Sequence, residues 1–145
     1  YLRDDFCDIM EGVVRSRFRL DLITAVTSVP LTIRHRFLRG YDQCAIIAKE
    51  LSRRIGRPYF PLLKRCGFPK QQAGLSEEER VENVKGTFAV RDALRVKLGE
   101  IAKPLVLIVD DVMTTGSTLD ECAKTLKHAG VGAVWTVALS ATRKD

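Results

Sequence analysis

Two adjacent carboxylates followed by a cluster of small hydroxyl residues form the part of the sequence best suited to chemistry. Asp110 and Asp111 precede a short run made of Thr114, Thr115, Gly116, Ser117 and Thr118. Small residues let backbone N–H groups converge on a phosphate, and a helix that begins there favours an anion through its dipole. Because two carboxylates would repel that phosphate, we expect them to face away from it and to accept hydrogen bonds from a ribose, or to help hold a cation bound to it. The pattern predicts a binding site for a phosphorylated ligand.

The segments around this motif predict a strand, a helix and a second strand. Leu105 to Val109 is a continuous apolar run, which is typical of a strand buried on both faces of a parallel sheet. Thr118 to Ala129 has the pattern of an amphipathic helix, and Ala133 to Leu139 is another apolar strand. Such a unit has parallel strands, and ligands of open α/β sheets bind outside the carboxyl ends of those strands. The motif lies between the first strand and the helix, at that position.

The rest of the chain predicts further elements of the same α/β class, in one domain over residues 1–145. We expect a parallel sheet flanked by helices, with residues 1–21 as an amino-terminal helix or hood remnant. Residues 66–85 lack a clear apolar face, and a connection of that length in a small domain is usually functional or mobile. The other expected elements are a helix over Asp5 to Arg17, a strand over Leu22 to Val29, a helix over Tyr41 to Ile55, and short strands over Tyr59 to Leu63 and Thr87 to Val90.

Composition and charge narrow the class of ligand. The 145 residues are 46% hydrophobic and 29% charged, which excludes a disordered or collagen-like chain, and the net charge is +6. Between Arg34 and Lys70 there are ten basic residues against two acidic ones, an excess larger than that of the whole chain. Such a segment favours a polyanion, either nucleic acid or a small phosphorylated molecule.

The cysteines and the hydropathy pattern indicate a cytoplasmic protein. The four cysteines are scattered, form no C-x-x-C pair and are accompanied by only two histidines, so we expect reduced, buried thiols rather than a zinc site or a disulfide framework. No apolar run approaches the roughly 20 residues needed to span a bilayer, and no secretory signal is present, so we expect no membrane contact. Because the chain begins at Tyr1 rather than Met, we expect a fragment or an incomplete gene product.

Three alternative roles for the paired aspartates have less support. Receiver domains also carry paired aspartates after a strand, but after the first strand rather than near position 110 of 145. A Walker B strand would require an upstream G-x-x-x-x-G-K-[ST] motif, which the sequence lacks. A simple helix cap needs a single acceptor rather than this whole set of residues.

The residues carry a resemblance to a known family. Val106 to Thr118 resembles the thirteen-residue motif by which type I phosphoribosyltransferases bind 5-phosphoribosyl-1-pyrophosphate (PRPP). Arg39 to Gln43, and Gln72 to Ser76 with the nearby Arg80, make the chain similar to the competence protein ComF family with its GntX branch, from about residue 22 to residue 139. Members of that family commonly begin with a zinc-binding segment of C-x-x-C pairs. This sequence has no such pairs, so no zinc role is carried over.

The resemblance implies a role for each part of the site. Asp110 and Asp111 would be the catalytic pair that holds the ribose hydroxyls, and Thr114 to Thr118 would bind the 5′-phosphate. Mg²⁺ would be held mainly by PRPP, with no direct ligand from the protein. The loop after the first core strand would meet the pyrophosphate, and residues 66–85 would be the flexible loop that closes over PRPP. The implied pyrophosphate contacts are Pro30, Leu31, Arg34 and Arg39, and those of the flexible loop are Lys70, Gln72 and Arg80.

The resemblance also implies the reaction. A phosphoribosyl group would pass from PRPP to an unidentified base or other acceptor, with release of magnesium pyrophosphate. The hood, which usually selects the acceptor in type I enzymes, would be short or truncated here. A protein that binds PRPP or a nucleotide without turnover, or an accessory protein of DNA uptake, is the alternative. A homodimer, single-stranded DNA and the competence machinery stay open as partners.

Overall fold

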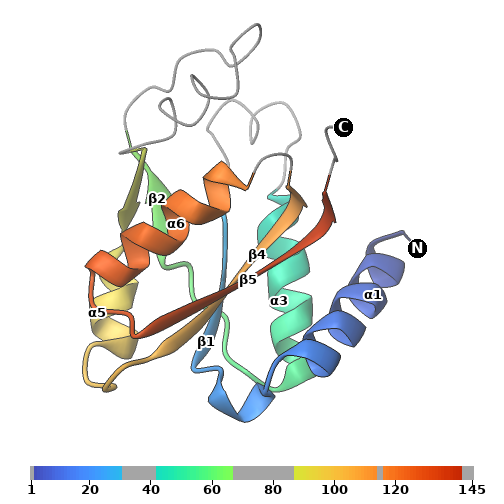
Figure 1. The fold of residues 1–145 in the computed structure, drawn as a ribbon, viewed down its shortest axis with the longest axis horizontal. Helices are drawn as coiled ribbons and strands as arrows, with labels where there is room; N and C mark the ends of the chain where they lie inside the picture. The colour runs from blue at the N-terminus through green and yellow to red at the C-terminus, as the bar shows by residue number, and fades with distance from the viewer. Residues whose placement is uncertain (1, 31–41, 67–86, 114–115, 142–145) are drawn as a thin grey trace, which may run out of the picture.

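A three-stranded parallel sheet forms the centre of the fold. The computed structural model describes residues 2–30, 42–66, 87–113 and 116–141. Strands β1 (Ala25–Ser28), β4 (Leu105–Met113) and β5 (Ala133–Ala141) pair in parallel in the order β1-β4-β5, as Figure 1 shows. The predicted α/β class and its parallel sheet are confirmed, and so is the strand, helix and strand unit around the motif.

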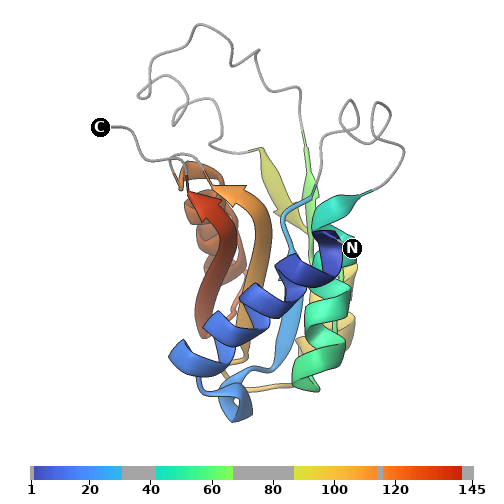
Figure 2. The same cartoon turned by 90° about the vertical axis from the view of Figure 1, so that its right-hand side faces the viewer.

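Helices cover both faces of this sheet. Helices α1 (Leu2–Arg17) and α3 (Gln43–Ile55) pack on one face, and α6 (Ser117–His128) packs on the other (Figures 1 and 2). The short α5 (Asp92–Leu98) contributes to the same core cluster as α6. Strand β4 is buried on both sides because alternate residues point to opposite faces. Leu107 and Val109 join the core under α1 and α3, whereas Val106 and Ile108 join the core under α6. The continuous apolar run predicts a strand buried on both faces, and β4 is that strand, at the middle of the sheet.

Two short strands form a separate antiparallel pair beside the sheet. β2 (Leu63–Arg65) pairs with β3 (Phe88–Val90), and the core under α6 includes Leu63 and Phe88. The strand expected over residues 59–63 is therefore wrong in its bounds, because Tyr59 makes only a single parallel bridge, to Val26. A 3-10 turn over Leu20–Leu22 likewise delays the start of β1 to Ala25.

Helix α3 has well-defined ends. The side chain of Asp42 accepts a hydrogen bond from the Ala45 N–H at 3.0 Å, which satisfies one donor of the first turn. Gly56 ends the helix with φ of +71°, a left-handed conformation that favours glycine. The helix begins two residues later than the sequence predicts and ends at the predicted residue.

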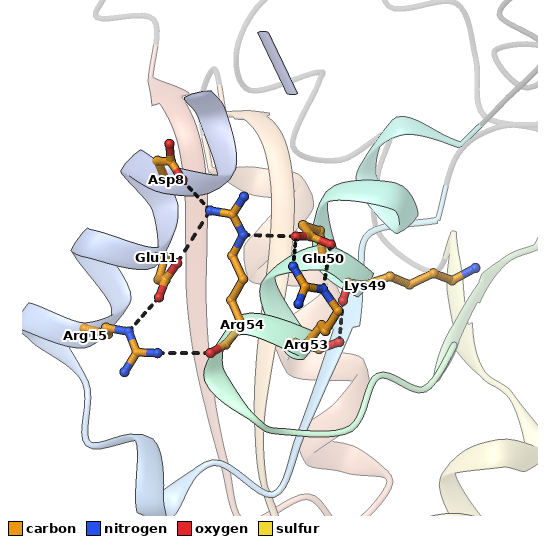
Figure 3. A network of polar contacts seen from close by, with 8 residues as sticks. Asp8, Glu11, Arg15, Lys49, Glu50, Arg53 and Arg54 are labelled. Atoms are coloured by element: carbon orange, nitrogen blue, oxygen red, sulfur yellow. Dashed lines mark hydrogen bonds and ion pairs between the residues drawn. The ribbon is translucent and has the colours of Figure 1, made fainter. Parts of the chain in front are cut away.

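A network of ion pairs joins α1 to α3. Figure 3 shows Arg54 of α3 between Asp8 and Glu11 of α1 and Glu50 of its own helix. Arg15 of α1 adds a hydrogen bond from its guanidinium to the Arg54 carbonyl oxygen, at 3.0 Å. Hydrogen bonds from the guanidinium groups of Arg53 and Arg54 hold the pKa of Glu50 at about 2. The network fixes α1 against the helix whose opposite end reaches the candidate site.

The four cysteines form no disulfide, and three of them, Cys7, Cys44 and Cys122, are buried, as the sequence predicts. Within the described ranges, no helix combines the length and apolar character needed to cross a membrane. The flexible loop expected over residues 66–85 lies outside the described residues, apart from Cys66 at its start.

Candidate functional site

The paired aspartates lie inside the central strand. β4 continues to Met113, so the expectation that the strand ends at Val109 is wrong by four residues. The extension is paired with β5, where Asp110 lies opposite Ala138 and Val112 opposite Ser140. Figure 1 shows that the carboxyl end of β4 and the first turns of α3 and α6 lie at the same end of the molecule. Asp110 and Asp111 therefore occupy the edge of the sheet where ligands of α/β proteins bind.

A thiol from α3 contacts both carboxylates. The Sγ atom of Cys44 lies 3.4 Å from Oδ1 of Asp110 and 3.3 Å from Oδ1 of Asp111. The same Oδ1 of Asp110 accepts a hydrogen bond from the Asp111 backbone N–H at 2.9 Å. Asp110 is 8% exposed and Cys44 is 2% exposed, so these contacts are screened from water, whereas Asp111 is half-buried. No pattern in the sequence indicated that Cys44 belongs to the site.

Burial and mutual repulsion set the charge of this cluster. Burial raises the pKa of Asp110 to about 6, and the adjacent Asp111 contributes to that rise through hydrogen bonding and charge. Burial and the two carboxylates also raise the pKa of Cys44, so its thiol is protonated at neutral pH and donates rather than accepts. Among the described residues, this cluster therefore combines two carboxylates, which accept hydrogen bonds, with one neutral thiol, which donates them.

The amino end of α6 follows directly on the chain. Gly116 adopts φ of +81°, which favours glycine, and its carbonyl oxygen accepts the Asp120 N–H at 2.9 Å, so the helix begins at once. No side chain caps the helix from this position. Ser117 and Thr118 follow as the first two helical residues and are half-buried. The described part of the predicted phosphate loop thus lies at the amino end of α6, a position where the helix dipole favours an anion.

An arginine that no sequence motif marks lies near the carboxylates. Arg65 ends β2, donates from Nε to the carbonyl oxygen of Pro30 at 2.8 Å, and lies over the Phe88 ring at 4.8 Å. Burial lowers the pKa of Arg65, while the charge of Asp110 opposes that change. Pro30, a predicted pyrophosphate contact, therefore lies beside a partly buried cation. The sequence includes Arg65 in the basic segment from Arg34 to Lys70 but does not single it out.

Several predicted site residues fall outside the described part of the chain. Among the described ones, Asp110 and Asp111 lie near the end of β4, Gly116, Ser117 and Thr118 lie at the start of α6, and Pro30 accepts a hydrogen bond from Arg65. The predicted residues outside the described ranges are Leu31, Arg34, Arg39, Lys70, Gln72, Arg80, Thr114 and Thr115.

The carboxylates offer limited direct ligation to a metal. Among the described residues, Cys44, Asp110 and Asp111 bring one sulfur and two carboxylate oxygens to within 4.8 Å of one another. Mg²⁺ takes oxygen ligands and keeps several of its waters. A protonated thiol is not a ligand for it. The carboxylate oxygens can accept hydrogen bonds from the waters of a magnesium ion that a ligand carries.

Comparison with known proteins adds an independent line of evidence. Residues 42–145 match the family model described as Phosphoribosyl transferase domain. The chain is 38% identical over 114 residues to Competence protein F of Haemophilus influenzae, and 34% identical over 116 residues to DNA utilization protein YhgH of Escherichia coli K12. These alignments cover 78% and 79% of the chain but 48% of each relative. The chain thus spans about half the length of these curated relatives.

Solved structures agree with the fold. An adenine phosphoribosyltransferase from Thermoanaerobacter pseudethanolicus superposes with a TM-score of 0.56, covering 95% of this chain and 67% of that one at 16% identity. At that identity the likeness concerns the fold alone. The sheet flanked by helices is that of type I phosphoribosyltransferase structures, and the resemblance seen in the sequence motifs is confirmed.

Proposed function

The chain belongs to the phosphoribosyl transferase domain family, and from that premise we propose that it binds PRPP and transfers the phosphoribosyl group to a base or other acceptor. One observation carries the proposal most strongly. Two carboxylates near the end of the central strand are followed after four residues by a glycine-initiated helix. This arrangement offers acceptors for a ribose diol beside donors for its 5′-phosphate.

The residues would act by binding and orientation. Asp110 and Asp111 accept hydrogen bonds from the two ribose hydroxyls, and the amino end of α6 from Gly116 onward receives the 5′-phosphate. Arg65 supplies positive charge on the side of Pro30, where the pyrophosphate is expected. During transfer the bond from the anomeric carbon to the pyrophosphate oxygen breaks, and the pyrophosphate leaves with the electron pair. The acceptor donates its lone pair to the anomeric carbon, and an acceptor nitrogen that carries hydrogen then releases a proton to water. Catalysis then depends on positioning and on stabilisation of the leaving charge.

Mg²⁺ bound to PRPP would neutralise the charge of the departing pyrophosphate. The Asp110 and Asp111 carboxylates would help to hold this ion by accepting hydrogen bonds from the water molecules bound to it.

A binding experiment tests the first half of the proposal. Isothermal titration with PRPP and Mg²⁺ should give saturable binding to the wild-type chain, and the double change of Asp110→Asn with Asp111→Asn should abolish it. Glu100→Gln, an exposed change in the turn after α5, is the matched control and should bind as the wild type does. Equal affinity in the double variant and the wild type would contradict the proposed site.

A second candidate function follows from the relatives. Two of them carry names that refer to competence and to DNA utilization, and the segment from Arg34 to Lys70 has ten basic residues against two acidic ones. The chain would then bind PRPP or a nucleotide without turnover, within a protein that assists DNA uptake or use.

Turnover separates the two candidates. A pyrophosphate-release assay with a broad panel of bases and amines should show acceptor-dependent release if the chain is a transferase. Retained PRPP binding with no release across the panel would favour the binding module. A gel-shift titration with single-stranded DNA at several salt concentrations then measures whether the basic segment contributes, because phosphate contacts make binding strongly salt-dependent.

A further inference from the structure

The side chains of two adjacent strand residues normally point to opposite faces of a sheet. In β4 this alternation places Leu107 and Val109 toward α3, and Ile108 toward α6. By the same alternation Asp110 and Asp111 should diverge. Instead, an oxygen of each carboxylate lies within 3.4 Å of a single atom, Sγ of Cys44. The two acids therefore converge on Cys44 of α3, while a hydrogen bond within β4, from the Asp111 N–H to Oδ1 of Asp110, also orients the first of them.

We infer that Cys44 is a positioning residue, whose thiol holds the carboxylates of Asp110 and Asp111 in one orientation for the ligand. The expected effect on PRPP binding rests on the proposed function. The contacts of Cys44 with the two carboxylates do not depend on it. Cys44 is the second residue of α3, after the Asp42 cap, and is 2% exposed. Helix α3 is fixed at this end by its cap and at its other end by the Arg54 network.

The thiol is suited to this task because it is neutral. Its single proton bonds to either carboxylate in turn, and both acceptor oxygens are within reach of sulfur. Burial and the two acids keep it protonated. A protonated, buried thiol is also a poor nucleophile, so oxidation or alkylation is not its role. The thiol adds a second donor at Oδ1 of Asp110, which also accepts the Asp111 N–H, and a donor at Oδ1 of Asp111.

The groups around Asp110 allow this contact to be measured. Asp111 of the same strand raises the pKa of Asp110, and the hydrogen bond from Cys44 of α3 lowers it. From the other side, the charge of Asp110 acts on Arg65 of β2, while burial and the charge of Asp110 raise the pKa of Cys122 of α6 to about 12, so this thiol is neutral where Asp110 titrates. Loss of the Cys44 donor should therefore raise the pKa of Asp110, since the hydrogen bond favours the ionised form.

Three variants of Cys44 separate hydrogen bonding from packing. Cys44→Ala removes the donor, Cys44→Val removes it while keeping the space filled, and Cys44→Ser keeps a donor. Cys122→Ala on α6 is the control, because it removes another fully buried thiol that makes no hydrogen bond to either carboxylate among the described contacts. Carbon-detected NMR titration of the side-chain carboxyls measures the pKa of Asp110 in each protein, and calorimetry measures the affinity for PRPP with Mg²⁺.

The expected result has two parts. The Ala and Val variants should show a higher pKa for Asp110 and bind PRPP about tenfold more weakly, the loss typical of one hydrogen bond to a charged group. The Ser variant and the Cys122→Ala control should match the wild type in both measurements. Unchanged carboxyl titration in the Ala and Val variants would overturn the inference, and so would an equal loss in the Ser variant. If the titration responds but the wild type itself binds no PRPP, the proposed function fails while the orienting role of Cys44 stands.

Discussion

Replacement of Asp110 by asparagine should stabilise the protein at neutral pH while it removes ligand binding. Asp110 is 8% exposed, and its pKa of about 6 lies above its ordinary value of 3.8. Because the folded-state pKa is raised, the stability linked to this group is fully present below pH 3.8 and is lost as the pH rises through 6. At pH 7 the Asp110 carboxyl of the folded protein is therefore ionised, although its buried surroundings favour the neutral form.

The size of the effect follows from the same pKa. A difference of about two pH units at about 1.4 kcal/mol each gives up to about 3 kcal/mol. Asparagine has nearly the same shape and keeps an oxygen that accepts the Asp111 N–H, so the contact at 2.9 Å is retained. We expect Asp110→Asn to raise the free energy of unfolding at pH 7 by up to this amount, and to raise it little at about pH 3.5.

Urea denaturation at several pH values is the appropriate assay. The difference between Asp110→Asn and the wild type should grow from about pH 3.5 to pH 7, while the exposed control Glu100→Gln shows no such trend. A variant that is less stable than the wild type at pH 7, with a difference independent of pH, would refute the reasoning. Asp110 would then be a structural hydrogen-bond acceptor rather than a destabilising group retained for binding.

Four further predictions test other parts of the molecule. PRPP affinity, measured by calorimetry, should fall about tenfold between pH 7 and pH 5 because protonation removes the Asp110 carboxylate; a flat profile would contradict this. Arg54→Met should lower the melting temperature relative to the wild type. This decrease should become smaller as the pH falls from about 4.5 toward 2, because protonation of Glu50 ends its contribution to the network. A loss that is the same at both pH values would show that Glu50 contributes nothing to the network. Leu107→Ala should reduce the free energy of unfolding in urea by about 2–5 kcal/mol, because Leu107 is fully buried in β4; a loss below about 1 kcal/mol would contradict this placement. Gly56→Ala should cost about 1 kcal/mol in the same assay because alanine is strained at φ of +71°, whereas no loss would argue against the left-handed helix end.

The parts of the fold set by local patterns were predictable. Strand β4 was recognised from a continuous apolar run, and α3 from its apolar spacing and the glycine that ends it. Helix α5 was missed because its seven residues are too few to show a helical period, although Leu94 and Leu98 are buried. The end of β4 was placed too early, because acidic residues usually mark the end of a buried strand and pairing with β5 is not visible in the sequence.

The residues of the candidate site also fall into two groups, those that a sequence motif identifies and those that only the fold brings together. Asp110, Asp111 and Gly116 stand together in one stretch of chain, so a motif identifies them. Cys44 and Arg65 reach the same place from α3 and β2, and only the tertiary packing brings them there. The scattered cysteines were expected to be buried thiols. That expectation is confirmed for three of the four, but it carried no signal that one of the thiols would contact the paired acids.

A crystal structure of the chain with PRPP and Mg²⁺ tests the central claim most directly. We predict that the two ribose hydroxyls lie within about 2.5–3.0 Å of carboxylate oxygens of Asp110 and Asp111, with the 5′-phosphate at the amino end of α6. PRPP bound elsewhere, or bound with its ribose hydroxyls away from both carboxylates, would contradict the claim.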